Sequence, residues 1–232
     1  MRRTVALLLM LASGCTAKKA EPPVVPLDPK VAALVAKCPA SSLACDDLAD
    51  VYAKGTYNMP VDMPHAAELY GKACDNGLDM GCRHLAAMYS DGRLPKDPVK
   101  VLALLTKACD MGLKLACDDL GDFHTRGAPN SQLSLAEPAY RKACEAGLGM
   151  ACGHVASLYR DGRGVTRDIP TAILFYQRGC DAGTPLNCDD LGDIFAKGIG
   201  GRFDRTKAAL YYRRGCDGKL QMSCDHLAAL KP

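Results

Sequence analysis

The sequence predicts an all-α protein, built as an α/α solenoid of about five helix-turn-helix repeats. Three observations predict this fold. Cysteine pairs recur along the chain at intervals of 36, 35, 35, 36 and 36 residues, counted from Cys38 to Cys216. Between these pairs, apolar residues recur at helical spacing, and strand patterns are absent. A fixed period in this range is typical of stacked helix pairs, each too small to bury its own apolar face.

The start of the chain predicts export. Arg2 and Arg3 precede an apolar run from Val5 to Ala12, which is too short to span a bilayer and suits the hydrophobic region of a signal peptide. The residues from Leu11 to Cys15 then resemble a bacterial lipobox, which implies a signal peptide over residues 1–14 and a lipid on Cys15. Ordinary signal-peptidase cleavage, with no role for Cys15, is the alternative.

Residues 15–29 form a polar, proline-rich segment, with four prolines between Pro22 and Pro29. This composition predicts a stiff, extended tether without a core of its own. We expect the tether to hold the folded part, residues 30–232, away from a membrane surface. Thr16 after the lipobox favours the outer membrane of the cell envelope.

One repeat shows how each unit is expected to fold. A first helix opens at Cys152, and its apolar stripe comprises Val155, Ala156, Leu158 and Tyr159. Gly162 and Gly164 then interrupt the helical pattern. The second helix, residues 171–180, has an apolar face made of Ala172, Ile173, Phe175 and Tyr176. Gly183 ends it, as glycine commonly does after a helix C-terminus.

The two ends of the repeat array differ from its middle. Residues 28–37 supply only a segment like a second helix, and the chain stops at Pro232 just after the first helix of a sixth unit. We therefore expect five full repeats with a half-repeat cap at each end.

These residues resemble the Sel-one-like repeat, a relative of the tetratricopeptide repeat. The family pattern is similar to Leu191-Gly192, Tyr159, Gly162 to Val165, Asp168 and Ala208 to Tyr212. The resemblance covers roughly residues 30 to 230, and the cysteine pair in each repeat extends it to the Helicobacter cysteine-rich protein family. It implies a right-handed solenoid whose first helices line the concave surface. The third repeat departs from the pattern at His124, at the connector 128–133 and at Pro138.

Twelve of the thirteen cysteines fall into six pairs, which leaves only Cys15 over. Such parity predicts an oxidising compartment and a disulfide framework. We expect six inter-repeat disulfides that join Cys38 to Cys45, Cys74 to Cys82, Cys109 to Cys117, Cys144 to Cys152, Cys180 to Cys188 and Cys216 to Cys224. A tight helical hairpin can bring such Cα atoms within the ~4.4 to 6.8 Å that a disulfide needs. Zinc or haem sites are the alternatives, but no C-x-x-C or C-x-x-C-H occurs.

Acidic and imidazole side chains alternate along the first helices. Two residues after the second cysteine of each pair, the series is Asp47, His84, Asp119, His154, Asp190 and His226. Three residues later it is Asp50, Ala87, Asp122, Ser157, Asp193 and Ala229, and four beyond that it is Lys54, Asp91, Arg126, Asp161 and Lys197. The three rows share one helix face, because their spacing is i, i+3 and i+7.

Three interpretations of these rows stay open: charge pairing between neighbouring repeats, a groove for peptide or carbohydrate groups, and a weak metal site. Three histidines cannot converge on one ion, because repeats in stacked helices step ~10 Å apart. A metal site would therefore need a single pair of side chains, such as His84 with Asp119. His124 beside His154 is the other candidate pair, for which core packing is the alternative. The candidate groove residues are Asp47, Asp50, His84, Asp119, Asp122, His154, Asp190, Asp193 and His226.

Composition excludes some classes of protein. A hydrophobic content of 48% excludes a disordered polymer, and the net charge of +3, which falls to +1 without Arg2 and Arg3, makes nucleic acid a poor partner. We expect no cofactor and no resident metal. The preferred function is an exported, lipid-anchored scaffold that binds a peptide, a protein segment or a cell-wall component such as peptidoglycan.

The cysteine-rich resemblance also implies an enzyme, a β-lactam-binding protein or β-lactamase. The residues do not support it, because Ser-x-x-Lys, Ser-Asp-Asn, Lys-Thr-Gly and clustered histidine ligands are all missing. We name no catalytic residue and expect nitrocefin turnover no faster than that of a denatured control. A third possibility is a purely structural spacer, whose role would survive charge reversal at Asp50, Asp122 and Asp193.

Overall fold

The computed structural model describes residues 27–127 and 131–230, which form twelve α-helices and three short 3-10 helices, with no strand among them. The first helices of the repeats are α2 (Ser42–Lys54), α4 (Asp79–Asp91), α6 (Lys114–Thr125), α8 (Gly149–Asp161), α10 (Pro185–Ala196) and α12 (Gln221–Ala229). The second helices are α1 (Pro29–Lys37), α3 (Met63–Asp75), α5 (Pro98–Asp110), α7 (Ala136–Glu145), α9 (Ile169–Asp181) and α11 (Arg205–Asp217). The 3-10 helices are η1 (Cys38–Ala40), η2 (Leu133–Leu135) and η3 (Ile199–Gly201).

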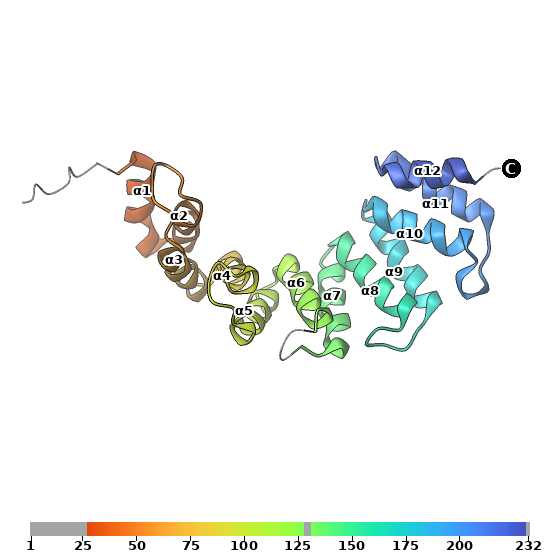
Figure 1. The fold of residues 1–232 in the computed structure, drawn as a ribbon, viewed down its shortest axis with the longest axis horizontal. Helices are drawn as coiled ribbons and strands as arrows, with labels where there is room; N and C mark the ends of the chain where they lie inside the picture. Colours follow the sequence, from red (N-terminus) through yellow and green to blue (C-terminus); the bar gives the residue numbers. More distant parts are fainter. Residues whose placement is uncertain (1–26, 128–130, 231–232) are drawn as a thin grey trace, which may run out of the picture.

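The helices stack in chain order, and each packs mainly against the one before it and the one after it. Figure 1 shows the stack bent into an arc that runs from α1 to α12, with α4 and α6 on the inner side of its middle and α5 and α7 on the outer side. The expected five full repeats with α1 and α12 as half-repeat caps are confirmed.

All six expected disulfides are present, and each joins a second helix, or the turn that follows it, to the first helix of the next repeat. Their Cα to Cα distances lie between 4.4 and 4.8 Å. The bonded pairs are Cys38 with Cys45, Cys74 with Cys82, Cys109 with Cys117, Cys144 with Cys152, Cys180 with Cys188, and Cys216 with Cys224. The cysteines are buried except in the last pair, so most clips lie inside the stack.

Five of the six turns that carry the disulfides share one backbone feature, a residue with positive φ, and the turn from Cys38 to Cys45 lacks it. Four of them contain a glycine with positive φ, at Gly77, Gly112, Gly147 and Gly183. In the last turn Lys219 takes this position, with a φ of 68°. The left-handed residue reverses the chain tightly enough to bring the two helix ends within reach of a disulfide.

In the five full repeats, four of the second helices begin at an aspartate that caps the helix N-terminus. Asp62, Asp97, Asp168 and Asp204 each accept a hydrogen bond from the backbone N–H three residues later, at 2.9 to 3.2 Å. Among the full repeats the exception is α7, which follows η2 without a side-chain cap and has ten residues where α3, α5, α9 and α11 have thirteen. The irregular third repeat therefore keeps its helix but shortens the first turn.

Glycine in the connector after α8 allows close packing between repeats. Gly164 has a φ of 73°, and a Cβ built there would lie 2.5 Å from the carbonyl oxygen of Leu133 in the preceding repeat. Only a residue without a side chain fits that approach. The connector of one repeat thus rests directly on the backbone of its neighbour.

The predicted signal peptide, lipidated Cys15 and nearly all of the tether lie outside the described residues. Among the residues that are described, no helix is both long and apolar enough to cross a membrane.

Candidate binding surface on the first helices

Neighbouring first helices are joined by a ladder of side-chain bonds. Each rung joins two positions that are counted from the second cysteine of a repeat. One is the first residue after that cysteine, and the other is the second residue after the corresponding cysteine of an adjacent repeat. Three rungs join a carboxylate to a histidine Nδ1: Asp46 to His84 at 3.1 Å, Asp118 to His154 at 2.9 Å and Asp189 to His226 at 3.1 Å. A fourth rung joins Arg83 Nε to Asp119 at 2.6 Å.

The ladder corrects one sequence expectation. His84 does not pair with Asp119, because Asp119 binds Arg83 while His84 binds Asp46 of the preceding repeat. The aspartates that bind histidine are 3 to 9% exposed and were not among the predicted site residues. A signal existed in the Cys-Asp-Asp motif of α2, α6 and α10, where the first aspartate turns into the stack and the second, such as Asp47, faces outward.

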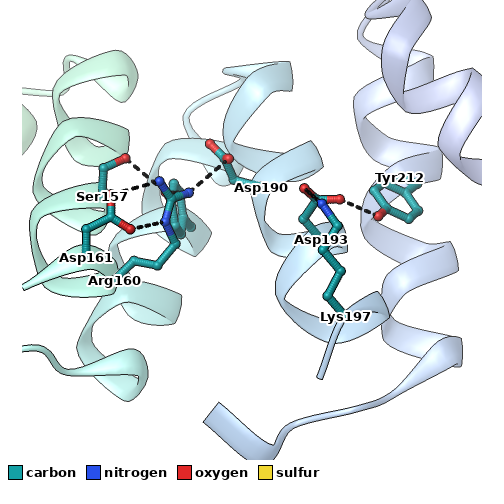
Figure 2. A network of polar contacts seen from close by, with 8 residues as sticks. Ser157, Arg160, Asp161, Asp190, Asp193, Lys197 and Tyr212 are labelled. Atoms are coloured by element: carbon teal, nitrogen blue, oxygen red, sulfur yellow. Dashed lines mark hydrogen bonds and ion pairs between the residues drawn. The ribbon is translucent and has the colours of Figure 1, made fainter. Parts of the chain in front are cut away.

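A second layer of polar bonds lies beside three of these rungs. A tyrosine of the second helix donates its hydroxyl to an aspartate of the first helix, and a lysine or arginine one turn further along pairs with the same carboxylate. The triads are Tyr70–Asp50–Lys54, Tyr140–Asp122–Arg126 and Tyr212–Asp193–Lys197. In the third, the two bonds to Asp193 measure 2.7 and 2.6 Å (Figure 2).

In two of the triads, these contacts favour the charged form of the carboxylate. Burial raises the pKa of Asp193, but the hydrogen bonds from Lys197 and Tyr212 outweigh it and hold the pKa below its ordinary value. Asp50 has a lowered pKa for the same balance of causes, with Lys54 and Tyr70 as its partners. Asp50 and Asp193 therefore present fixed charges on the surface rather than groups poised to exchange protons.

The histidines of the ladder also pack against the tyrosines of the triads, with ring centroids 4.7 to 5.1 Å apart. Burial lowers the pKa of His154, but the hydrogen bond and the charge of Asp118, with Asp122 adding, outweigh it and raise the pKa above 6.5. These three imidazoles are thus structural partners of buried aspartates.

His124 lies in the core. It is 5% exposed, and its Nδ1 accepts the backbone N–H of Gln132 at 3.1 Å. Burial lowers its pKa. Within the described ranges, no group of three or more His, Cys, Asp or Glu side chains could hold a metal ion.

An exposed apolar row runs beside the acidic row. Two residues before the second cysteine, every first helix carries leucine or methionine: Leu43, Met80, Leu115, Met150, Leu186 and Met222. This position is one turn before the Asp/His row, so both rows share a face. Four of the six side chains are 43 to 59% exposed. These residues were not among the predicted site residues, although their fixed position in each repeat was a signal.

The inner side also has a hollow of about 400 Å³ between α4, α5 and α6, here called the α4/α6 hollow. Its apolar floor is made of Ala86, Val101, Leu105 and Phe123. Its rim carries charged side chains of both signs: Arg83, Lys96, Asp119, Asp122 and Arg126.

The α4/α6 hollow exists because one repeat lacks a tyrosine. Four residues before the first cysteine, the other full repeats carry Tyr70, Tyr140, Tyr176 and Tyr212, whose hydroxyls bond to Asp50, Asp122, Ser157 and Asp193. In α5 this residue is Leu105, and its partner position in α4 is Ala87. The shorter leucine and the missing polar partner leave the space open.

Asp190, like Asp47 at the start of the stack, is a member of the predicted row that has no rung among the described residues. Its Oδ1 lies 3.5 Å from Arg160 Nη1, across the gap between α8 and α10 in Figure 2. Burial raises the pKa of Asp190, Arg160 lowers it, and the nearby carboxylates of Asp189, Asp193 and Asp161 also raise it, so that the pKa is about 6. This carboxyl is therefore short of positive charge.

The sequence pattern of the Sel1 repeat matches residues 42–78, 80–113, 149–184 and 188–219, together more than half of the chain. The unmatched stretch contains the irregular third repeat. No curated protein sequence matches the chain.

Solved structures with similar folds include a protective antigen of uropathogenic Escherichia coli with an SLR fold, at a TM-score of 0.74 and 24% identity, over 86% of this chain and 44% of the antigen. A Sel1 repeat protein from Oxalobacter formigenes has a TM-score of 0.69 and 24% identity over 77% of this chain and 74% of its own. Cysteine rich protein B of Helicobacter pylori is 26% identical over 56% of this chain and 96% of its own, with a TM-score of 0.46. The chain thus spans less than half the length of the E. coli antigen.

Proposed function

The chain belongs to the Sel1 repeat family, and from this premise we propose that it is an exported repeat scaffold whose inner face holds an extended segment of a partner protein or peptide. Export is supported by the six disulfides, because such bonds persist in oxidising compartments. The leader and the lipobox-like residues before Cys15 support a lipid anchor.

The observation that carries the proposal is the α4/α6 hollow, which lies beside the apolar and acidic rows of the first helices. An extended chain that crosses several repeats would meet one apolar and one polar side chain at each step. The hollow interrupts this regular surface and has an apolar floor that suits one large apolar side chain. Because a disulfide holds each joint between repeats, the inner face should lose little conformational entropy when it binds.

A pocket-filling variant tests this proposal. When Leu105→Tyr is combined with Ala87→Ser, the hollow regains the Tyr–Ser pair that Tyr176 and Ser157 form at 3.0 Å. A photo-crosslinking amino acid at Ser90, a residue that lines the hollow, would report the partner in intact cells. We expect the double variant to weaken capture about tenfold, or ~1.4 kcal/mol of binding free energy.

Two controls accompany this experiment. Ala103→Ser changes an exposed residue of the same helix that does not line the hollow, so capture should stay at the wild-type level. A crosslinker placed at Ala103 should capture no partner whose capture is weakened by the Leu105→Tyr change. Equal capture from both positions, or no loss in the filled variant, would count against the inner face as the binding surface.

The proposed anchor has a separate test. The wild-type protein should take up an alkyne-labelled fatty acid and fractionate with membranes, and Cys15→Ser should do neither. Soluble, unlabelled wild-type protein would contradict the anchor and leave the binding proposal untouched.

A further inference from the structure

A second hollow, of about 370 Å³, lies between α8, α10 and the turn before α12, and is here called the α8/α10 hollow. Its outer walls are Met150 and Leu186, which are 52% and 50% exposed. Deeper in, it is lined by Gly153, Asn187 and Asp190. The hollow thus combines apolar walls with a polar end.

The ladder between first helices breaks at this hollow. Between α4 and α6 the rung is Arg83 to Asp119, at 2.6 Å. The equivalent pair between α8 and α10 is Gly153 and Asp190, and glycine has no side chain to form the rung. Asp190 therefore lacks the guanidinium that its counterpart Asp119 binds within the chain.

Asn187 explains why the arginine is missing. A Cβ on Gly153 would lie 2.1 Å from the amide oxygen of Asn187, so no side chain fits there, whereas the residue equivalent to Asn187 in α6 is the small Ala116. Asn187 is 2% exposed, and its Nδ2 donates to the carbonyl oxygen of Gly149 at 2.7 Å. No hydrogen bond among the described residues uses its amide oxygen, which leaves an acceptor at the polar end of the hollow.

The charges around Asp190 favour an added cation. Arg160 reaches it only at 3.5 Å, because the guanidinium also donates to Asp161 at 2.8 Å and to the hydroxyl of Tyr176 at 2.8 Å. Figure 2 shows this division, with Arg160 between Asp161 and Asp190. His154, also in the lining, is engaged by Asp118, and Lys219 lies in the turn at the far wall.

We propose that the α8/α10 hollow is a subsite for a basic side chain, lysine or arginine, of the segment that the inner face holds. The inference rests on the proposed function and adds the chemistry of one partner residue. The aliphatic stem lies between Met150 and Leu186, and the cationic head reaches the carboxylate of Asp190 and the amide oxygen of Asn187, taking the place that Arg83 fills for Asp119.

Small probes test the subsite without the partner. N-acetyl-lysine methylamide and N-acetyl-arginine methylamide, added at millimolar concentration to the oxidised protein, should shift the NMR amide signals of Gly153 and Asp190. N-acetyl-norleucine methylamide keeps the stem without the charge and should bind about tenfold more weakly. Equal shifts by norleucine, or no shift with any probe, would overturn the proposal.

Two variants localise the effect. Asp190→Asn should weaken lysine binding about tenfold, while the matched Asp110→Asn, whose carboxylate binds Lys142 at 2.9 Å outside both hollows, should leave it unchanged. Gly153→Arg combined with Asn187→Ala copies the Arg83 and Ala116 pair into the hollow and should abolish binding by supplying an internal cation. An amide spectrum close to wild type checks that each variant is folded. Equal losses in both aspartate variants would refute the assignment.

This result is separable from the test at Ser90. Loss of probe binding with partner capture intact would reject the subsite alone, whereas probe binding without any partner capture would reject the groove function.

Discussion

Single side chains of the ladder decide how the repeats register with one another. Asp46, Asp118 and Asp189 are buried, and each is satisfied by a histidine of the following repeat. A buried carboxylate without a partner is costly, so each rung fixes which surface of the next repeat faces it. The alternation of Asp and His is therefore a packing device between repeats, and the outward-facing carboxylates beside it stay available to a ligand.

We expect the Asp118 carboxylate to hold the proton on His154. The pKa of His154 should lie above 6.5 in the wild type and fall below it in Asp118→Asn, because burial alone lowers it. The rung should stabilise the fold fully below pH 6.5 and lose this contribution as pH rises through the raised pKa. An NMR titration of the imidazole signals measures both values; Asp119→Asn is the control, and an unchanged pKa in Asp118→Asn would contradict the rung.

His124 should show the opposite sign. Its pKa is lowered by burial, so the unfolded chain binds more protons, and stability should fall as pH drops from 6.5 toward the folded pKa. His124→Phe restores the aromatic residue found as Phe195 in α10 and removes this titration. Urea unfolding at pH 7.5 and pH 5 should show a smaller difference in the variant; an equal or larger difference would reject the buried, neutral state of His124.

Residue-level prediction from sequence succeeded in part. The repeated spacing located the Asp/His row, but it suggested Asp119 as the partner of His84, whereas His84 binds Asp46, which lies one residue before the row in the preceding repeat. One residue turns a helix face by about 100°, and which face meets the neighbour depends on how the repeats are rotated against one another. The rotation between repeats depends on how the whole stack packs, so it cannot be predicted from the sequence of one helix.

At the scale of helices and turns, the disulfides replace the core that each small repeat lacks. Ten of the twelve cysteines are themselves buried, so the bridges also form part of the apolar interior. The end of α9 followed from sequence, since Gly183 lies just past it as expected, whereas α8 and α9 begin at Gly149 and Ile169 rather than at the expected residues 152 and 171. The hollows did not follow from sequence, because they arise where one repeat differs from the rest, as at Leu105.

Removing a central clip should open the stack locally. Replacing both Cys109 and Cys117 with alanine should cost about 2.5 kcal/mol in the chain-entropy model. Because repeats contact only their neighbours, hydrogen exchange should rise most in α5 and α6. The matched replacement of Cys38 and Cys45 should raise exchange mainly in α1 and α2. Uniform loosening along the whole chain in the central variant would argue against local clips.

The turn before α12 offers a stabilising change. Lys219 has a φ of 68°, where the equivalent turns use glycine. Lys219→Gly should raise the unfolding free energy by about 1 kcal/mol by removing the cost of a side chain in the left-handed region. Thermal unfolding compares it with Lys107→Gly, a substitution inside α5 that should destabilise. A destabilised Lys219→Gly variant would show that the lysine makes contacts worth more than its backbone cost.

At the scale of the molecule, the repeats have a nearly fixed length, and one disulfide holds each joint between them. The inner face that we propose as the binding surface is therefore stiff. The period of the cysteines was enough to predict the stack, its repeat count and its caps. The curvature of the arc and the position of the α4/α6 hollow were not predictable, because both depend on small packing differences summed over many repeats.

The most direct measurement of this account is the thiol state of the protein in its own compartment. Protein taken from the cell envelope should be denatured without reductant, alkylated and weighed intact. The account predicts no alkylation at any of the twelve paired cysteines and a full shift of twelve alkyl groups only after reduction. Alkylation of the paired cysteines before reduction would contradict an exported, disulfide-clipped scaffold.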